Sequence, residues 1–187
     1  MAEQSPTAIL EAEHHVIQKI VGAMAVLTEG LEAGQEPPVE TLGHIVEFMR
    51  TFADKCHHAK EEAHLFPFLE QRGVPARGCP IGVLLHEHER GRTLVAQLAQ
   101  ATEAYASGNV STRDAVTEAL RGLTELYPSH IWKEEYLLFP MSHKVLSAAD
   151  QQQLVEKFAE VEAAIGREIH QGFERIAEKI VQGTHAL

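Results

Sequence analysis

CHHAKEEAHLFP, residues 56–67, returns at residues 129–140 as SHIWKEEYLLFP. Seven of the twelve positions are identical when His57 is aligned with His130, so both stretches contain H-x-x-K-E-E-x-x-L-F-P. A His and a Glu four residues apart share one face of an α-helix. A Glu-His pair precedes each copy, at residues 13–14 and 87–88, and equivalent histidines lie 73 or 74 residues apart. The sequence therefore predicts two similar halves that present the same chemistry.

Apolar residues recur every three or four positions in five segments, which predicts five helices. We expect them at Thr7–Leu31, at Val39–Gln71, at Ile81–Ser107, from Ser111 onward, and from Ser147 to about Gln182. Loops containing Gly, Pro, Ser or Asn separate them, and no alternating strand pattern is present. These features predict an all-α fold, with a four-helix bundle over residues 1–146. A C-terminal helix over residues 147–187 would pack on the bundle within the same domain, or pair with another copy in a homodimer.

The composition excludes several classes of partner. The chain has 187 residues, of which 44% are hydrophobic, and this suits a single domain with one core. Its formal net charge of −11 argues against binding to nucleic acid or to an anionic membrane surface. It contains no apolar run near the ~20 residues that span a bilayer, and no secretory signal pattern. Two cysteines without a disulfide or zinc pattern favour a cytoplasmic protein with reduced thiols.

The apolar stripes contain polar residues that need a partner. His14, His88, His130 and Glu134 all fall in them, and no Lys or Arg lies in these stripes near the centre of the bundle. A buried carboxylate is costly unless positive charge compensates it. Two divalent cations would supply that charge, each bound by two imidazoles and two bridging carboxylate oxygens. Imidazole and carboxylate ligands without sulfur suit iron, zinc or manganese, and an open dinuclear site in a helix bundle favours iron.

Four segments together resemble the hemerythrin-like (HHE cation-binding) domains. They are Glu13-His14-x-x-Ile17, His57-His58-x-x-Glu61-Glu62, Leu85-His86-Glu87-His88-Glu89-x-Gly91-Arg92 and His130-Ile131-x-Lys133-Glu134-Glu135. The resemblance covers about residues 7–145 and implies an up-down-up-down bundle around a non-haem centre of two iron ions, with oxo or hydroxo and carboxylate bridges. Zinc or manganese is less favoured. The implied metal ligands are His14, His57, Glu61, His88, His130 and Glu134.

The chain departs from the oxygen-carrying members of that family. Those proteins have H-x-x-x-H on the third helix, whereas here Leu84 lies four residues before His88. They also end with H-x-x-x-x-D, whereas here Glu134 and Glu135 occupy the fourth and fifth positions after His130. The resemblance therefore implies sensing, binding or detoxification of O₂, peroxide or NO, or the holding of iron, rather than reversible oxygen carriage.

Several residues of the predicted site have alternatives. His15 competes with His14, His58 competes with His57, and His86 is a candidate fifth histidine at the rim. Tyr127 lies one helical turn before His130, either as a core tyrosine or as a hydrogen-bond partner of a small ligand at the metals. Glu62 and Glu135 are candidates for orienting the metal-binding imidazoles.

Two other functions compete with the one just described. A ferritin-like di-iron oxidase or peroxidase requires Glu-x-x-His on two helices. Glu11-x-x-His14 and Glu61-x-x-His64 fit that spacing, but the second half of the chain does not reproduce them. An interaction module with a structural metal is the other alternative. The pattern assigns no catalytic residue, and it is compatible with a weak peroxidase-like or catalase-like activity.

Overall fold

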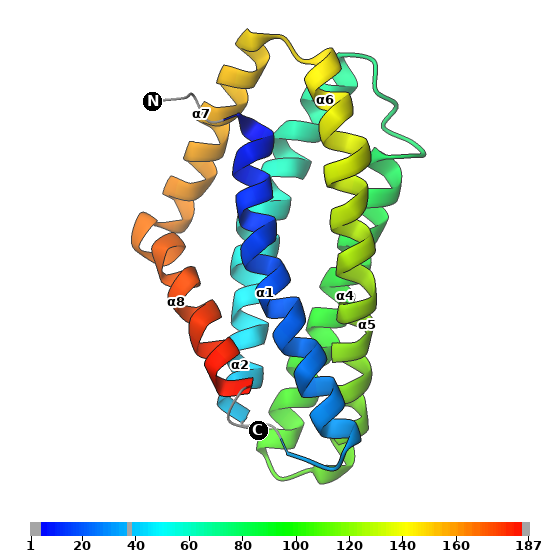
Figure 1. Ribbon diagram of the computed structural model, residues 1–187, viewed down its shortest axis with the longest axis vertical. Helices are drawn as coiled ribbons and strands as arrows, with labels where there is room; N and C mark the ends of the chain where they lie inside the picture. Colours follow the sequence, from blue (N-terminus) through cyan, green and yellow to red (C-terminus); the bar gives the residue numbers. More distant parts are fainter. Residues whose placement is uncertain (1–4, 37–38, 185–187) are drawn as a thin grey trace.

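The computed structural model describes residues 5–36 and 39–184, and every regular element in those ranges is helical. The first helix is α1 (Pro6–Glu32), and the third is α4 (Ile81–Ala106). The second comprises α2 (Val39–Phe48), the π-helical η1 (Met49–His58) and η2 (Glu61–Leu65), and α3 (Phe66–Gln71). The fourth comprises η3 (Val110–Thr112), α5 (Arg113–Lys133), the π-helical η4 (Glu134–Leu138) and α6 (Phe139–Val145). These segments run in alternating directions along the long axis (Figure 1), which confirms the predicted all-α bundle.

The core consists of two apolar clusters, one toward each end of the long axis of the bundle. One is centred on α1, α2 and α5 and contains Phe48 and Phe52, and the other contains Phe66 and Phe139 from the repeated L-F-P segments. All four rings are at most 3% exposed. Burying each such ring contributes roughly 1.5–3 kcal/mol. The polar residues of the repeat lie between these clusters, so apolar packing fixes the helices on either side of them.

π-helical turns occur where the repeated H-x-x-x-E motifs lie. Hydrogen bonds from residue i to i+5 rotate the chain less per residue than those of an α-helix, so adjacent side chains point in more similar directions. In η1 the consecutive residues Cys56, His57 and His58 are all at most 2% exposed. Adjacent histidines therefore both face the interior, which the α-helical spacing does not predict.

The C-terminal segment forms two helices, and the prediction of one continuous helix is wrong. Ser147 caps α7 (Ala148–Ile165) by accepting from the Asp150 amide, while the Asp150 side chain accepts from the Ser147 amide. Gly166 has φ of 100°, a conformation that favours glycine and ends the helix, and α8 (Arg167–Thr184) follows it.

The two C-terminal helices cover different parts of the bundle. The chain turns at the α7–α8 junction, and α8 continues along α1 and α2 (Figure 1). The α7 residue Phe158 packs in the cluster of Phe66, whereas Phe173 of α8 packs on Phe48 and Phe52, with ring centroids 6.0 and 5.2 Å away. Helix α7 thus covers the cluster that contains Phe66, and α8 covers the cluster that contains Phe48.

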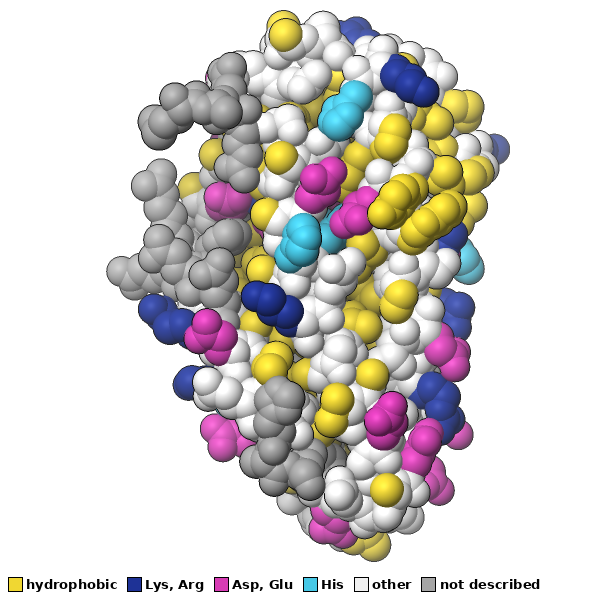
Figure 2. Space-filling view, viewed as in Figure 1, with side chains coloured by type: hydrophobic (Ala, Val, Ile, Leu, Met, Phe, Trp, Pro, Cys, Tyr) yellow, Lys and Arg dark blue, Asp and Glu magenta, His cyan; other side chains and the backbone are white. Residues whose placement is uncertain are grey.

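The positive charges are dispersed on one face of the molecule. On the face shown in Figure 2, Lys and Arg side chains lie apart from one another and form no continuous basic patch. Within the described part of the chain, no helix combines the length and the apolar character that a membrane span requires.

Candidate metal centre

The six residues implied as metal ligands lie together in the middle of the bundle. Each is at most 2% exposed, and they come from both halves of the repeat. They are His14 on α1, His57 on η1, Glu61 on η2, His88 on α4, His130 on α5 and Glu134 on η4. The alternating helix directions bring these distant positions to one level, so the fold assembles the chemistry that the repeat contains.

The histidines form two pairs with matching geometry. The ring centroids of His14 and His57 are 4.7 Å apart, and those of His88 and His130 are 4.8 Å apart. Two imidazoles bound at right angles to one ion, with bonds of about 2.1 Å, have centroids about 4.6 Å apart. Each pair therefore has the spacing of two neighbouring ligands on a common metal ion.

Two carboxylates connect the pairs. Glu134 places Oε2 3.1 Å from Nε2 of His14 and Oε1 3.1 Å from Nε2 of His130, so its two oxygens face different pairs. Oε2 of Glu61 lies 3.7 Å from Nε2 of His57 and 3.5 Å from Nε2 of His88. Donor atoms that share one ion at right angles are about 3 Å apart. The arrangement fits two cations bridged by both carboxylates.

A close contact between two ring nitrogens requires a positive charge. Nε2 of His14 and Nε2 of His57 are 3.1 Å apart, while the Nδ1 atoms of these rings are hydrogen-bonded to Glu135 and Glu13. An ionised carboxylate only accepts hydrogen bonds, so each Nδ1 carries the proton and each Nε2 of a neutral ring carries a lone pair. A cation, or in its absence a proton, must lie between the two lone pairs.

The same region contains buried polar atoms without partners. Among the described residues, both carboxylate oxygens of Glu61 and of Glu134 and the Nε2 atoms of His88 and His130 have no hydrogen-bond partner. Leaving such atoms unpaired in a protein interior costs about 1–3 kcal/mol each, and more for charged groups. The residues therefore fit a pair of metal ions, which would bind all of these atoms at once.

The two bridging carboxylates differ in ionisation when only protein groups surround them. Burial, followed by the nearby Glu134 carboxylate, raises the pKa of Glu61 well above its usual value. Burial also opposes ionisation of Glu134, but His130 and the other histidines lower its pKa well below its usual value. A metal that binds both must displace the proton of Glu61, so binding is coupled to pH.

Each of the four histidines donates its Nδ1–H to a carboxylate adjacent in sequence to another ligand. The acceptors are Glu135 for His14 at 2.9 Å, Glu13 for His57 at 3.0 Å, Glu62 for His88 at 2.6 Å and Glu87 for His130 at 3.1 Å. Metal-binding histidines are commonly fixed in this way. These bonds explain why the sequence repeats E-H and E-E: one residue of each doublet is a candidate metal ligand and the other orients an imidazole.

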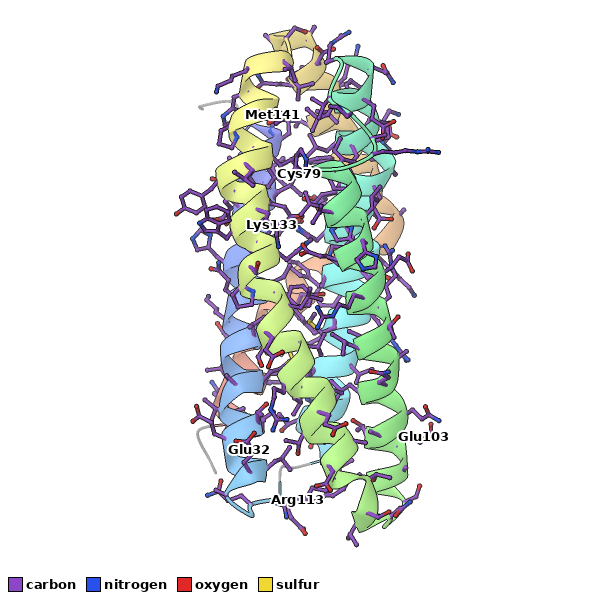
Figure 3. The ribbon with its side chains drawn as sticks, turned by 90° about the vertical axis from the view of Figure 1, so that its right-hand side faces the viewer. Glu32, Cys79, Glu103, Arg113, Lys133 and Met141 are labelled. Carbon is purple, nitrogen blue, oxygen red and sulfur yellow. The ribbon has the colours of Figure 1, made fainter. Side chains whose placement is uncertain are left out.

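The repeated lysines hold two of these orienting carboxylates. Lys60 forms ion pairs with Glu13 and with Glu162 of α7, at 2.7 Å for the latter, and Lys133 lies 2.7 Å from Glu87. Lys133 is on the upper part of α5 (Figure 3). The side chain of Lys60 is fully buried, which corrects the expectation that no Lys lies near the centre. It was not foreseen because Lys60 lies beside the apolar stripe, where α7 covers it.

The structure separates the histidine alternatives. His15 is exposed and bonds to the Glu11 carbonyl, whereas His14 faces the centre. His57 and His58 are both buried there, because the π-helical turn directs both inward. His86 is exposed, and no group of potential metal ligands among the described residues includes it. The structure thus does not bring His86 to the centre as a fifth histidine.

Tyr127 lies beside the centre and is 4% exposed. Its ring centroid is 6.1 Å from that of His130 and 6.5 Å from that of His58. A Cβ atom added to Gly91 would lie 3.5 Å from its hydroxyl oxygen, so the hydroxyl lies directly beside Gly91. Burial raises the pKa of Tyr127, which keeps the hydroxyl protonated.

The ferritin-like Glu-x-x-His motifs each place only one of their two residues at the centre. Glu11 and His64 are only partly buried, and no potential metal cluster of the described chain contains either. The Glu-x-x-His spacing therefore does not place a second Glu or His at the centre.

Sequence reasoning missed the roles of Glu13, Glu87 and the two lysines. The repeat itself was the available signal, since all four occur at equivalent positions of the two halves. It also missed that His58 accompanies His57, and only the π-helical geometry of η1 reveals that arrangement.

A helical bundle around buried imidazoles and carboxylates is typical of a cation-binding protein. The model of the family described as hemerythrin HHE cation binding domain matches residues 5–142. The chain belongs to this family.

Relatives in mycobacteria match most of the chain. "Uncharacterized protein Rv1995" of Mycobacterium tuberculosis and "Uncharacterized protein Mb2018" of Mycobacterium bovis are each 28% identical over 174 residues. The match covers 91% of this chain and 66% of the length of each relative, so the chain spans slightly less than two thirds of these proteins. No solved structure matches the chain.

Proposed function

We propose that this chain is a non-haem di-iron protein that binds, senses or detoxifies a small oxidant such as O₂, hydrogen peroxide or NO. One observation carries the proposal: two histidine pairs with the spacing of shared ligands face two carboxylates whose buried oxygens have no hydrogen-bond partner. Family membership supports cation binding, and an open dinuclear site with carboxylate ligands inside a helix bundle favours iron.

The chain's own residues have three tasks in this function. His14 and His57 would hold one ion and His88 and His130 the other, and Glu61 and Glu134, which lie between the two pairs, would supply carboxylate oxygens. The orienting carboxylates fix each imidazole with its Nε2 lone pair toward the centre. Burial excludes bulk water. Bound iron would supply electron transfer and a coordination position for the oxidant.

The position of Leu84 supports sensing or detoxification of a small oxidant over reversible oxygen carriage. It occupies the place of the additional third-helix histidine that the oxygen carriers have, and it is fully buried in an apolar cluster. A leucine cannot bind metal, so the His88–His130 ion lacks that ligand. This difference supports sensing or detoxification.

Metal analysis combined with optical spectra tests the proposal. We expect the protein to carry two irons per chain and to show near-ultraviolet charge-transfer bands that change on exposure to O₂, peroxide or NO. Glu134→Ala should lose the iron and the bands. A colourless protein that contains only zinc and takes up no ferrous iron under anaerobic conditions would contradict the proposal.

A further inference from the structure

The repeat is broken at one buried position beside the centre. His58 of η1 corresponds to Ile131 in the second half, and both are buried, with 2% and 3% exposure. A ring nitrogen of His58 lies within 4.8 Å of a ring nitrogen of both His88 and His130. The His88–His130 side of the centre therefore has an extra imidazole where the repeat would place an aliphatic side chain.

The ring geometry disfavours His58 as a third ligand, although the nitrogens of His58, His88 and His130 are close enough together to hold one ion. Its centroid is 3.8 Å from that of His88, with an interplanar angle of 16°, and 5.9 Å from that of His130. Rings this close and nearly parallel lie face to face, and one ion cannot lie in both ring planes. Ligands at right angles would give about 4.6 Å for both distances. His58 instead stacks against the ligand His88 and lies next to the metal position.

A chain of charged groups fixes the His58 ring. Its Nδ1 lies 3.4 Å from Oδ1 of Asp54, which also accepts from Nε of Arg92 at 2.8 Å. Arg92 donates as well to Glu62 at 2.6 Å, the residue that orients His88. Because Asp54 accepts the Nδ1 proton, Nε2 of His58 carries a lone pair and can accept a hydrogen bond.

Tyr127 completes this side of the centre. Its ring is nearly parallel to that of His58, with an interplanar angle of 8°, and it lies one helical turn from His130. Ile131, the counterpart of His58, packs in an apolar cluster and offers no hydrogen-bonding atom in its side chain. The two sides of the centre thus differ in polarity despite the repeated ligands.

We propose that His58, held by Asp54 and Arg92, binds the small ligand on the His88–His130 side of the centre, and that it selects molecules that donate a hydrogen bond. Hydrogen peroxide is such a donor, whereas O₂ and NO have no hydrogen to donate. This inference rests on the proposed di-iron function and assigns its ligand site to one side, with a residue that the repeat does not predict.

The test compares peroxide with NO in iron-loaded variants. His58→Phe keeps a ring but removes the acceptor, His58→Gln keeps an acceptor, and Ile131→Val is the control at the equivalent position.

We expect His58→Phe to retain two irons per chain and to react with hydrogen peroxide about tenfold more slowly, a factor appropriate to one lost hydrogen bond. His58→Gln should stay within about threefold of the parent, because its amide oxygen still accepts a hydrogen bond. Affinity for NO, followed optically, should stay within about twofold in all variants, because NO makes no such bond.

Asp54→Ala provides a second variant that leaves His58 in place. Loss of the Nδ1 acceptor should slow the peroxide reaction in the same direction, with iron content unchanged. If the iron content of His58→Phe falls to about one per chain, His58 is a metal ligand and the inference is overturned. A crystal structure with iron bound to Nε2 of His58 would overturn it in the same way. Equal effects on peroxide and NO, or no effect on either, would also overturn it. Failure of the parent protein to bind iron would instead reject the proposed function.

Discussion

Single residues in this protein have roles that their neighbours in sequence do not share. His14 faces the metal centre with 0% exposure, while the adjacent His15 is exposed and bonds to a backbone carbonyl. The two residues have the same chemistry and differ only in direction. Direction therefore decides which of them can bind metal.

This pair gives a matched test. His14→Ala should reduce iron content from two to about one per chain or less, because it removes a ligand that Glu134 faces. His15→Ala should retain both irons. Metal analysis by mass spectrometry after anaerobic loading measures both variants. Equal iron contents in the two variants would contradict the assignment.

The two repeated lysines differ in burial, and this predicts different contributions to stability. The side chain of Lys60 is 0% exposed and that of Lys133 is 22% exposed. Lys60→Met removes the ion pairs with Glu13 and Glu162 and should cost about 3 kcal/mol, as expected for breaking a buried ion pair. Lys133→Met should cost about 1 kcal/mol or less because water partly screens that pair. Urea denaturation of the metal-free proteins measures both free energies, and equal losses would refute the difference.

At the scale of elements, the start of α7 connects the C-terminal segment to the bundle. Ser147 and Asp150 cap each other's backbone, and Arg72 donates to both oxygens of Asp150 from the segment after α3. Hydrogen bonds from Arg72 and Ser147 hold the pKa of Asp150 below its usual range. The ionised carboxylate of Asp150 thus joins the cap of α7 to the turn that follows α3.

The cap predicts a stability loss with a defined pH dependence. Ser147→Ala should cost about 1 kcal/mol, which is typical for loss of an N-cap. Asp150→Asn should also destabilise the protein at pH 7. Because the folded-state pKa of Asp150 is depressed, its contribution is present above the unfolded value of about 3.9 and is lost as pH falls below it. Urea titrations from pH 7 to pH 3 should therefore show the difference between parent and Asp150→Asn shrinking below about pH 4. A constant difference would contradict this account.

The helices themselves were predictable, and their irregularities were not. Apolar spacing located the bundle helices to within a few residues, because one buried stripe dominates each of them. The π-helical turns at His57 and Glu134 depend on hydrogen-bond register, which composition does not encode. The break at Gly166 was missed because a single glycine within a periodic pattern is also compatible with a continuous helix.

At the scale of the whole molecule, the repeat predicted the candidate site better than any local pattern. His and Glu at equivalent positions in the two halves indicated the six candidate ligands, and the fold brings all six together. The contacts from outside the repeat were not predictable. Glu162 reaches Lys60 from α7, and Asp54 and Arg92 meet beside His58, because tertiary packing alone brings these elements together.

The candidate centre predicts that the stability of the whole protein depends on metal. The folded chain buries carboxylate oxygens and ring nitrogens that have no hydrogen-bond partner, and bound cations would pair them. Metal that binds the folded state and not the unfolded state stabilises it by about 2.7 kcal/mol at a hundredfold excess over the dissociation constant. For a chain of this size, that corresponds to a rise in Tm of about 5–10 °C. Thermal unfolding with and without iron should show this rise.

Glu61→Gln separates metal binding from the intrinsic stability of the bundle. Burial and Glu134 raise the pKa of Glu61, so in the metal-free protein its carboxyl is protonated and resembles a glutamine amide in shape and charge. The variant without metal should therefore unfold within about 2 °C of the metal-free parent, a difference of no more than about 1 kcal/mol. It should gain little from iron, because an amide cannot bridge two cations as a carboxylate does. Glu160→Gln, at an exposed pair with Lys157, is the control and should keep the full rise. If iron stabilises Glu61→Gln as much as the parent, Glu61 does not bind the metal, and the buried carboxylates need another explanation.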